Sequence, residues 1–161
     1  LRALGARIDK RTYAEGVASA QVAGRLQRFE HNGVEIVVDV GHNPQAARAL
    51  AAWLRSQPQR RTQAVYAALA DKDASGVVAA LADTVDGWHL AGLAEAGPRG
   101  QDVDAFASRL AGTAAAAAIR HADVQAAVQA AMADAVPGER VLVFGSFHTA
   151  TIALQRLAAN G

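Results

Sequence analysis

Two residues that can bind a ligand or transfer a proton, Asp39 and His42, stand in the stretch 36–44, which reads Ile-Val-Val-Asp-Val-Gly-His-Asn-Pro. An ionised carboxylate among apolar residues is costly unless hydrogen bonds or a charge compensate for the lost hydration. Asp39 is therefore a candidate to accept hydrogen bonds from ribose hydroxyls or to pair with an arginine, or else it caps the adjacent turn. His42 is either a ligand contact in that turn or an ordinary surface histidine.

The sequence around these two residues predicts a strand, a sharp turn and a helix. The apolar, β-branched run over 34–40 is typical of a strand that is covered on both faces in a parallel sheet. Gly41 permits a tight turn, Asn43 is a good helix N-cap and Pro44 suits the first helical position. A helix over 44–56 follows. Because the first amides of a helix are unpaired and the helix dipole is positive there, this point attracts phosphate or carboxylate.

Three more residues could bind an anion. Arg25 precedes the first predicted strand, where its guanidinium either reaches phosphate oxygens across the end of the sheet or stays a solvated charge. Ser146, after Gly145, offers a hydroxyl and free amides at a helix start, which suits a carboxylate, although the same dipeptide also serves as a simple cap. Lys72 lies between two aspartates at another helix start, where acids are ordinary partners of the helix dipole.

Several familiar catalytic arrangements are missing from the sequence. It contains neither a GxGxxG loop nor a Walker A loop, so this chain alone supplies no complete phosphate cradle. Its five histidines lack metal-ligand spacing, and we predict no metal site. Ser146 and His148 stand two residues apart without a third triad member, so the sequence does not predict hydrolysis by that route.

The composition excludes several classes of partner. The 161 residues are 52% apolar and 19% charged with a formal net charge of +1, and no basic stripe or charge run occurs. No run approaches the roughly 18 apolar residues of a membrane span. Cysteine is absent, which excludes disulfides and thiolate chemistry and fits a reducing compartment. We therefore expect a soluble cytoplasmic protein with no nucleic-acid or membrane partner.

The order of the elements predicts an α/β fold. Residues 1–20 are expected to form a linker or a terminal helix, and 21–161 a single domain. A strand over 26–30 and the turn His31-Asn32-Gly33 predict an antiparallel hairpin with 34–40. Strands and helices then alternate, which predicts a mostly parallel sheet with helices on both faces. Further strands are expected over 62–69, 85–90, 114–118 and 140–144, and further helices through Leu81 and over 102–110, 123–135 and 149–158.

In sheets of this kind, ligands bind beyond the carboxyl ends of the strands. Asp39, His42, the stretch 71–73 and Ser146 all fall at the carboxyl ends of predicted strands. We therefore expect them to share one edge of the sheet.

Five short motifs occur in an order that resembles a known family. They are Gly24-Arg25-Leu26-Gln27, Asp39-Val40-Gly41-His42-Asn43-Pro44, Ala68-Leu69-Ala70-Asp71-Lys72-Asp73, Pro98-Arg99 and Phe144-Gly145-Ser146-Phe147. Together they resemble the C-terminal domain of folylpolyglutamate synthase/dihydrofolate synthase, in the Mur ligase superfamily, over roughly residues 12–159. Two positions depart from the family pattern: Gly41 stands where alanine is usual, and Val22-Ala23 stands where Trp-Pro is frequent.

The resemblance implies a Rossmann-like Mur ligase C-terminal domain and a ligase activity. The family joins L-glutamate to a pteroate or folate carboxylate, and it uses ATP to form an acyl phosphate that the glutamate amine attacks. The P-loop and the Mg²⁺ ligands of the family belong to an N-terminal ATPase domain, which this chain lacks. The resemblance therefore implies that this chain is the lid that closes on that P-loop domain and excludes water, and that it is inactive in isolation.

Carried over to matching positions, the resemblance implies roles for four residues. Asp39 would bind the ribose of ATP, and Arg25 its phosphates. His42 and Ser146 would lie at the glutamate pocket and the reacting centre, with His42 as the catalytic residue. Arg99 is expected on the same edge of the sheet without an assigned substrate atom.

Two alternatives remain open. The nearer one is a Mur-type ligase that acts on cell-wall peptide precursors, against which the stretches 68–73 and 144–147 favour the folate branch. The other is a free-standing, non-catalytic nucleotide-binding module with a doubly wound sheet. Within the folate branch, the residues do not separate dihydrofolate synthase from folylpolyglutamate synthase or from an enzyme with both activities.

Overall fold

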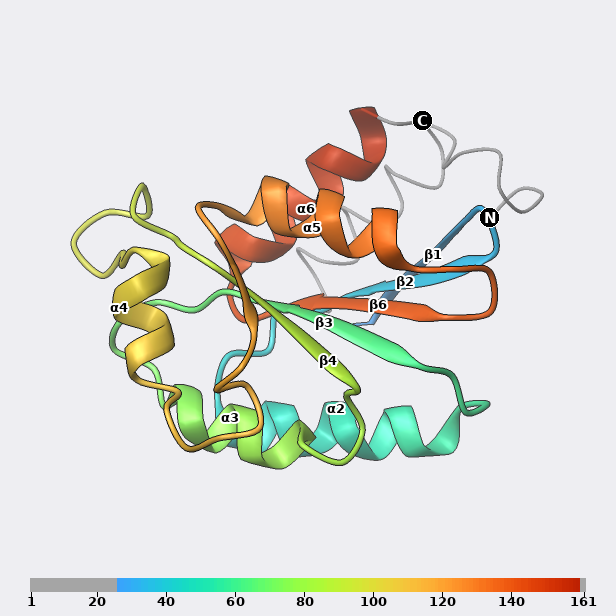
Figure 1. The fold of residues 1–161 in the computed structure, drawn as a ribbon, viewed down its shortest axis with the longest axis horizontal. Coiled ribbons are helices and arrows are strands. Elements are labelled where there is room, and N and C mark those ends of the chain that lie inside the picture. The colour runs from blue at the N-terminus through green and yellow to red at the C-terminus, as the bar shows by residue number, and fades with distance from the viewer. Residues whose placement is uncertain (1–25, 160–161) are drawn as a thin grey trace.

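The computed structural model describes residues 26–159, which form a single mixed sheet flanked by helices (Figure 1). The strands in this range are β1 (Gln27–His31), β2 (Val34–Val38), β3 (Thr62–Tyr66), β4 (Gly87–Ala91), β5 (Ile119–His121) and β6 (Arg140–Phe144). The helices are α2 (Pro44–Ser56), α3 (Ala74–Leu81), α4 (Val103–Ser108), α5 (Val124–Asp134) and α6 (Phe147–Ala159). The linker or terminal helix predicted over 1–20 and the candidate ligand residue Arg25 lie outside the described residues.

The strands follow the order β1-β2-β6-β3-β4-β5 across the sheet. β1 pairs antiparallel with β2, and the other neighbouring strands pair in parallel. Helices α5 and α6 cover one face, and α2, α3 and α4 pack on the other (Figure 1). The predicted fold class, a mostly parallel sheet with helices on both faces and an antiparallel first strand, is confirmed.

Each face of the sheet has its own apolar core. Strands β2, β3 and β6 are buried at every position, as expected for central parallel strands. Their alternate residues, such as Ile36 and Val143, pack against α5 and α6. On the opposite face four aromatic rings pack with centroids 4.7 to 6.3 Å apart, those of Tyr66, Trp88, Phe106 and Phe144. The two cores hold the strand ends, and the loops that leave them, in fixed positions.

The predicted N-terminal hairpin is confirmed. Gln27 pairs with Val38 and His31 pairs with Val34. Asn32 and Gly33 between them have φ values of 51° and 81°. This left-handed geometry at two successive residues is what a two-residue hairpin loop requires. Local sequence therefore sets the register of the antiparallel pair.

The strand predicted over 114–118 is wrong, and the edge strand β5 begins one residue after it. In place of strand pairing, the Ala116 N–H donates to the Thr113 carbonyl at 3.0 Å. The Thr113 hydroxyl accepts from the Ala115 N–H at 3.2 Å. Ala115 is buried in the core that contains α4. Alanine methyl groups bring too little apolar surface to favour a strand over these local turns.

Three predicted boundaries differ at the carboxyl edge of the sheet. β2 ends at Val38 rather than at residue 40, so Asp39 lies just beyond the strand. β3 ends at Tyr66 rather than at residue 69, so 67–69 run on as buried, irregular chain beyond the strand. Helix α6 begins at Phe147 rather than at about Thr149, because Ser146 caps it. Residues 39–40 and 67–69 therefore lie beyond the strand ends at this edge, and α6 begins closer to the end of β6 than the sequence predicted.

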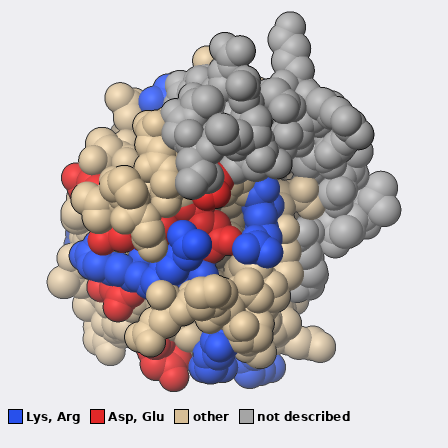
Figure 2. Space-filling model, turned by 90° about the vertical axis from the view of Figure 1, so that its right-hand side faces the viewer, with Lys and Arg blue, Asp and Glu red and all other residues tan. Residues whose placement is uncertain are grey.

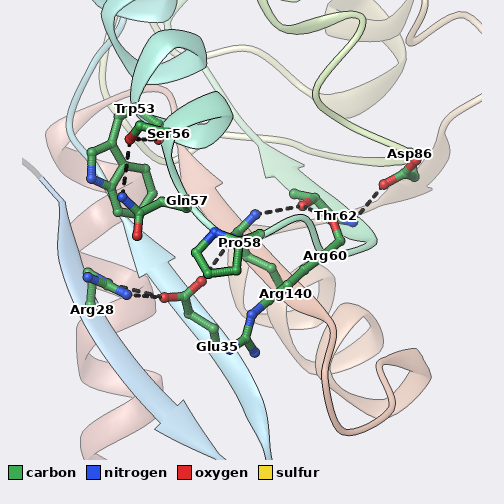
Figure 3. Close-up of polar contacts among 10 residues, drawn as sticks. All are labelled: Arg28, Glu35, Trp53, Ser56, Gln57, Pro58, Arg60, Thr62, Asp86 and Arg140. Atoms are coloured by element: carbon green, nitrogen blue, oxygen red, sulfur yellow. Dashed lines mark hydrogen bonds and ion pairs between the residues drawn. The ribbon is translucent and has the colours of Figure 1, made fainter.

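The opposite end of the sheet, where the parallel strands begin, is held by a buried ion pair. Arg140 donates from Nε to Glu35 Oε1 at 2.7 Å and from Nη1 to Thr62 Oγ1 at 3.3 Å (Figure 3). Arg28 donates to the other Glu35 oxygen at 2.7 Å. The Arg140 and Glu35 side chains are only 3% and 10% exposed. These bonds join the starts of β2, β6 and β3.

The surface around this end carries basic and acidic side chains side by side (Figure 2). Arg55 pairs with Asp83 at 3.2 Å. A cavity of about 290 Å³ lies here, with Arg60 and Asp86 also in its lining. Because charges of both signs line it, this cavity does not select for one charged ligand.

Within residues 26–159, none of the helices combines the length and the apolar character that a membrane crossing requires.

Candidate functional site

The connections after β2, β3 and β6 meet at the edge of the sheet where the parallel strands end. β6 lies between β2 and β3. The chain leaves β2 and β3 toward α2 and α3 on one face, but it leaves β6 toward α6 on the other face (Figure 1). A crevice forms between neighbouring strands whose connections go to opposite faces, and open α/β sheets bind their ligands there.

A cavity of about 190 Å³ lies at this edge. His42 lines it from the connection after β2, Lys72 from the connection after β3, and Arg99 from the connection after β4. The start of α6 provides the remaining side. The full set of lining residues is His42, Leu69, Lys72, Arg99, Ser146, Phe147 and His148. Two predicted site residues that are far apart in the sequence, His42 and Ser146, thus line the same cavity.

His42 is held by the turn that starts α2. The predicted cap is confirmed: Asn43 Oδ1 accepts from the Ala46 N–H at 2.8 Å, and Pro44 is the first helical residue. His42 Nδ1 lies 3.3 Å from the Val40 carbonyl oxygen. When Nδ1 carries the proton and donates to that carbonyl, Nε2 is the nitrogen that can accept a proton from a ligand.

Asp39 is 2% exposed and accepts hydrogen bonds from two backbone amides. Its Oδ1 accepts from the Leu26 N–H at 3.1 Å, and its Oδ2 accepts from the Gly41 N–H at 2.8 Å. The capping role that the sequence left open is therefore present. A Cβ at residue 41 would lie 2.7 Å from Asp39 Oδ2, so glycine fits this close contact. Asp39 is not among the residues that line the cavity, and its contact with ribose stays a prediction.

Ser146 uses its hydroxyl to cap α6. Ser146 Oγ accepts from the Thr149 N–H at 3.0 Å and lies 2.8 Å from Thr149 Oγ1. The Thr149 hydroxyl donates to the Ala67 carbonyl at 2.8 Å, so the Ser146 hydroxyl donates to Thr149. These bonds tie the start of α6 to the end of β3. They also occupy the Ser146 proton, which agrees with the expectation that Ser146 and His148 do not form a hydrolytic pair.

Gly145 lets α6 begin this close to β3. Its φ of +126° is in the left-handed range, and a Cβ there would overlap the Ala67 carbonyl oxygen. A larger residue would push the ends of β6 and β3 apart. The position of Ser146 in the cavity thus depends on glycine at 145.

Lys72 and Arg99 bring positive charge to the cavity, although the sequence assigned no substrate atom to either residue. Arg99 Nη1 lies 3.3 Å from Asp71 Oδ2, and Lys72 Nζ lies 4.0 Å from Asp71 Oδ1. Two cations share one carboxylate, so the cluster carries a net positive charge suited to a second carboxylate or a phosphate. In the sequence, both residues could be found as candidates because each follows a predicted strand. That they lie beside His42 depends on the order of the strands in the sheet.

The described residues suit an anion better than a metal ion. Among residues 26–159, no three His, Cys, Asp or Glu side chains are grouped so as to hold a metal. The starts of α2 and α6 both lie at the cavity, and helix starts favour negative charge.

The family comparison matches the domain that contains this site. Residues 24–147 match the model of the family described as Mur ligase, glutamate ligase domain. Dihydrofolate synthase/folylpolyglutamate synthase of Escherichia coli (strain K12) is 35% identical over 161 residues, which covers 99% of this chain and 36% of that protein. The UDP-N-acetylmuramoyl-L-alanyl-D-glutamate–2,6-diaminopimelate ligase of Streptomyces coelicolor is 34% identical over 156 residues, covering 88% of this chain and 30% of that ligase.

A solved structure shows the same arrangement of elements. The crystal structure of a bifunctional folylpolyglutamate synthase/dihydrofolate synthase with Mn, AMPPNP and L-glutamate bound aligns with a TM-score of 0.70 and 38% identity, over 84% of this chain and 31% of that one. This chain thus spans about a third of the length of the proteins that it matches. The match over 24–147 and these relatives show that the chain belongs to the Mur ligase family, as a glutamate ligase domain of the kind found at the C-terminus of folylpolyglutamate synthase/dihydrofolate synthase.

Proposed function

We propose that this chain is the C-terminal lid domain of an ATP-dependent ligase that adds L-glutamate to dihydropteroate, to folate or to both through an acyl phosphate. The observation that carries the proposal is the cavity at the carboxyl edge, where Lys72, Arg99 and His42 converge on the starts of two helices. The L-glutamate, Mn and AMPPNP in the solved relative support the same classes of ligand here.

L-Glutamate brings two carboxylates and one amine to its site. Lys72 and Arg99 supply positive charge for the carboxylates, and the starts of α2 and α6 add partial positive charge. When the amine attacks the acyl phosphate, the new C–N bond forms, phosphate leaves, and the amine loses a proton. His42 is the residue we assign to accept that proton. Ser146 contributes to the same pocket by fixing the start of α6.

For ATP, we assign the ribose to Asp39 and the phosphates to Arg25. The Leu26 and Gly41 amides hold the Asp39 carboxylate in one orientation before any ligand binds. Mg²⁺ would neutralise phosphate charge when bound, and its ligands are expected in the partner domain. That partner is the ligase's own N-terminal P-loop domain, since this sequence contains no Walker A loop. Closure of the two domains would exclude water from the acyl phosphate.

ADP release by the intact ligase that contains this domain tests the proposal. With ATP and Mg²⁺, we expect L-glutamate together with dihydropteroate or a folate to release ADP, and mass spectrometry to find a product longer by one glutamate. This chain alone should release none. Lys72→Met and Arg99→Met should each raise the KM for L-glutamate by about tenfold. ADP release without dihydropteroate or a folate, or an unchanged KM for L-glutamate in both variants, would contradict the assignment.

The Streptomyces coelicolor relative favours a second candidate, a Mur-type ligase for cell-wall peptide precursors. That enzyme would release ADP with a UDP-linked muropeptide and diaminopimelate and would not use dihydropteroate. The third possibility, a non-catalytic module, would bind ATP but release no ADP with either carboxylate substrate. The same assay, run with dihydropteroate and with the UDP-linked muropeptide, separates the three.

A further inference from the structure

Two loops carry the cations of the cavity, and they are bonded to each other. The loop 69–73 follows β3 and carries Lys72, and the loop 93–101 follows β4 and carries Arg99. The Ala70 N–H donates to the Arg99 carbonyl at 2.7 Å. Because β3 ends at Tyr66, no sheet pairing holds 69–73. Other contacts must fix the position of Lys72.

Besides the backbone turn bonds of the loop, Arg109 and Gln101 provide side-chain contacts that hold it. Arg109, the C-cap residue of α4, donates from Nη2 to the Lys72 carbonyl and from Nη1 to Gln101 Oε1, the latter at 3.2 Å. Gln101 Nε2 donates to the Ala68 carbonyl at 2.9 Å. The two side chains thus bond to each other and to both ends of the segment 68–72. We call this pair of side chains, Arg109 and Gln101, the clasp.

The clasp lies outside the cavity and on a rigid base. Neither Arg109 nor Gln101 is among the residues that line the cavity. Phe106, on the same helix as Arg109, packs edge-to-face on Tyr66 with centroids 5.1 Å apart. Burial raises the pKa of Tyr66, and the nearby Arg109 charge opposes that rise. Arg109 thus reaches the loop that presents Lys72 from the end of a helix whose Phe106 is fixed in the aromatic core.

We propose that Arg109 and Gln101 are positioning residues for the amino-acid substrate. By bonding to the backbone on both sides of the loop, they set where Lys72 stands relative to Arg99, and a dicarboxylate binds best when two cations are held at a fixed spacing. Turn bonds within the loop, such as that from the Lys72 N–H to the Leu69 carbonyl at 3.2 Å, order it locally. Without the clasp, the substrate would have to set part of the spacing between Lys72 and Arg99, at a cost to its affinity. This inference rests on the proposed function, and it adds two residues that act without touching the substrate.

Steady-state kinetics of the intact ligase test the clasp. Arg109→Met should raise the KM for L-glutamate by about tenfold, leave the KM for ATP unchanged and change kcat by less than about twofold. Gln101→Met should raise the KM for L-glutamate by about threefold. Arg109→Lys should recover part of the loss, because one donor to the Lys72 carbonyl is retained. Arg120→Met is the matched control: Arg120 bonds to Asp104 of the same helix at 3.0 Å, in an exposed pair that includes no residue of either loop.

A double variant distinguishes positioning from a purely structural role. If Arg109 acts through Lys72, then Lys72→Met/Arg109→Met should have nearly the KM of Lys72→Met alone, because the second change has nothing left to position. Fully additive effects, or a loss of kcat and of ATP use that follows a lower melting temperature, would overturn the inference. Should Arg109→Met fail to fold, Gln101→Met and Arg109→Lys give the same comparison. If the wild-type ligase shows no glutamate-dependent ADP release, the proposed function is refuted. If the ligase is active but the clasp variants keep the wild-type KM for L-glutamate, only the role of the clasp is refuted.

Discussion

Arg140 Nε and Glu35 Oε1 lie 2.7 Å apart at the amino end of the sheet, although 105 positions separate the two residues in the sequence. Burial by itself would raise the pKa of Glu35. Hydrogen bonds and charges from Arg140 and Arg28 outweigh that effect and lower the pKa below its usual value. The ion pair therefore stays charged and bonded inside the fold, and it joins β2 to β6 at the end opposite the candidate site.

Removing one partner of this pair should be strongly destabilising. Arg140→Met leaves the Glu35 charge with only Arg28, and we expect a loss of about 3 kcal/mol in the free energy of unfolding, measured by urea denaturation. Glu35→Met/Arg140→Met should be more stable than Arg140→Met, because no buried charge is left behind. Arg55→Met, which breaks the exposed pair with Asp83, should cost less than about 1 kcal/mol. Equal losses in Arg140→Met and Arg55→Met would contradict this account.

A pair of histidines should make the stability depend on pH. His89 Nδ1 lies 2.9 Å from His121 Nε2. Burial is the main cause that lowers the pKa of both residues, and the His121 charge lowers that of His89 further, with Asp134 opposing. Since the folded pKa values lie below the ordinary value of 6.5, the unfolded chain binds more protons below about pH 6.5, so stability falls as the pH drops from 7 to 5.

Urea denaturation at several pH values checks this dependence. His89→Gln should lose less stability than the wild type between pH 7 and pH 5, because the more buried histidine of the pair is gone. Gln125→Ala, at an exposed position of α5 that carries no titratable group, is the control and should keep the wild-type slope. An unchanged slope in His89→Gln would mean that other groups cause the effect.

Glycine at position 145 should be required for the approach of α6 to β3. Gly145→Ala combines an unfavourable φ of +126° with an overlap on the Ala67 carbonyl, and we expect a loss of about 3 kcal/mol or more. Gly112→Ala is the matched control, since its φ is +78° but nothing lies within 4 Å of its Cβ, and it should cost about 1 kcal/mol. Similar melting temperatures for the two variants would contradict the proposed overlap.

Asp39 should affect both stability and the use of ATP. Asp39→Ala removes the acceptor for the Leu26 and Gly41 amides, which should cost about 1–3 kcal/mol of stability. In the intact ligase, Asp39→Ala and Arg25→Ala should each lower kcat/KM for ATP by about a hundredfold. Asp86→Ala is the control, because Asp86 Oδ2 accepts a similar bond from the Thr62 N–H at 2.8 Å at the other end of the sheet. Near-normal turnover in both Asp39→Ala and Arg25→Ala would remove these residues from the ATP site.

Much of the fold could be predicted from the sequence, because the signals are local. Each signal determines the structure of its own short stretch of chain. Examples are the turn Asn32-Gly33, the helix cap Asn43 with Pro44, and the apolar runs of β2 and β6. The strand predicted over 114–118 is wrong because this stretch carries no comparable local signal. A run of alanines carries no periodic signal, so the hydrogen bonds of Thr113 and the burial of Ala115 decided its structure.

The candidate site could be predicted only in part. His42 and Ser146 follow strand ends and could be identified as candidates from the sequence and its resemblance. The cavity that groups them with Lys72 and Arg99 could not, and neither could the clasp of Arg109 and Gln101. Those contacts depend on loops after different strands, and sequence spacing does not tell which loops become neighbours.

The sequence alone determined the elements, the α/β class, the family resemblance and the edge on which charged residues would lie. Tertiary structure alone decided that β6 enters between β2 and β3, so that residues 42, 72, 99 and 146 surround one cavity and Arg140 meets Glu35. The physical reason is that helices, caps and hairpin turns gain their stability from neighbours in the chain. The order of parallel strands instead follows from burying two apolar faces at once, which involves the whole domain.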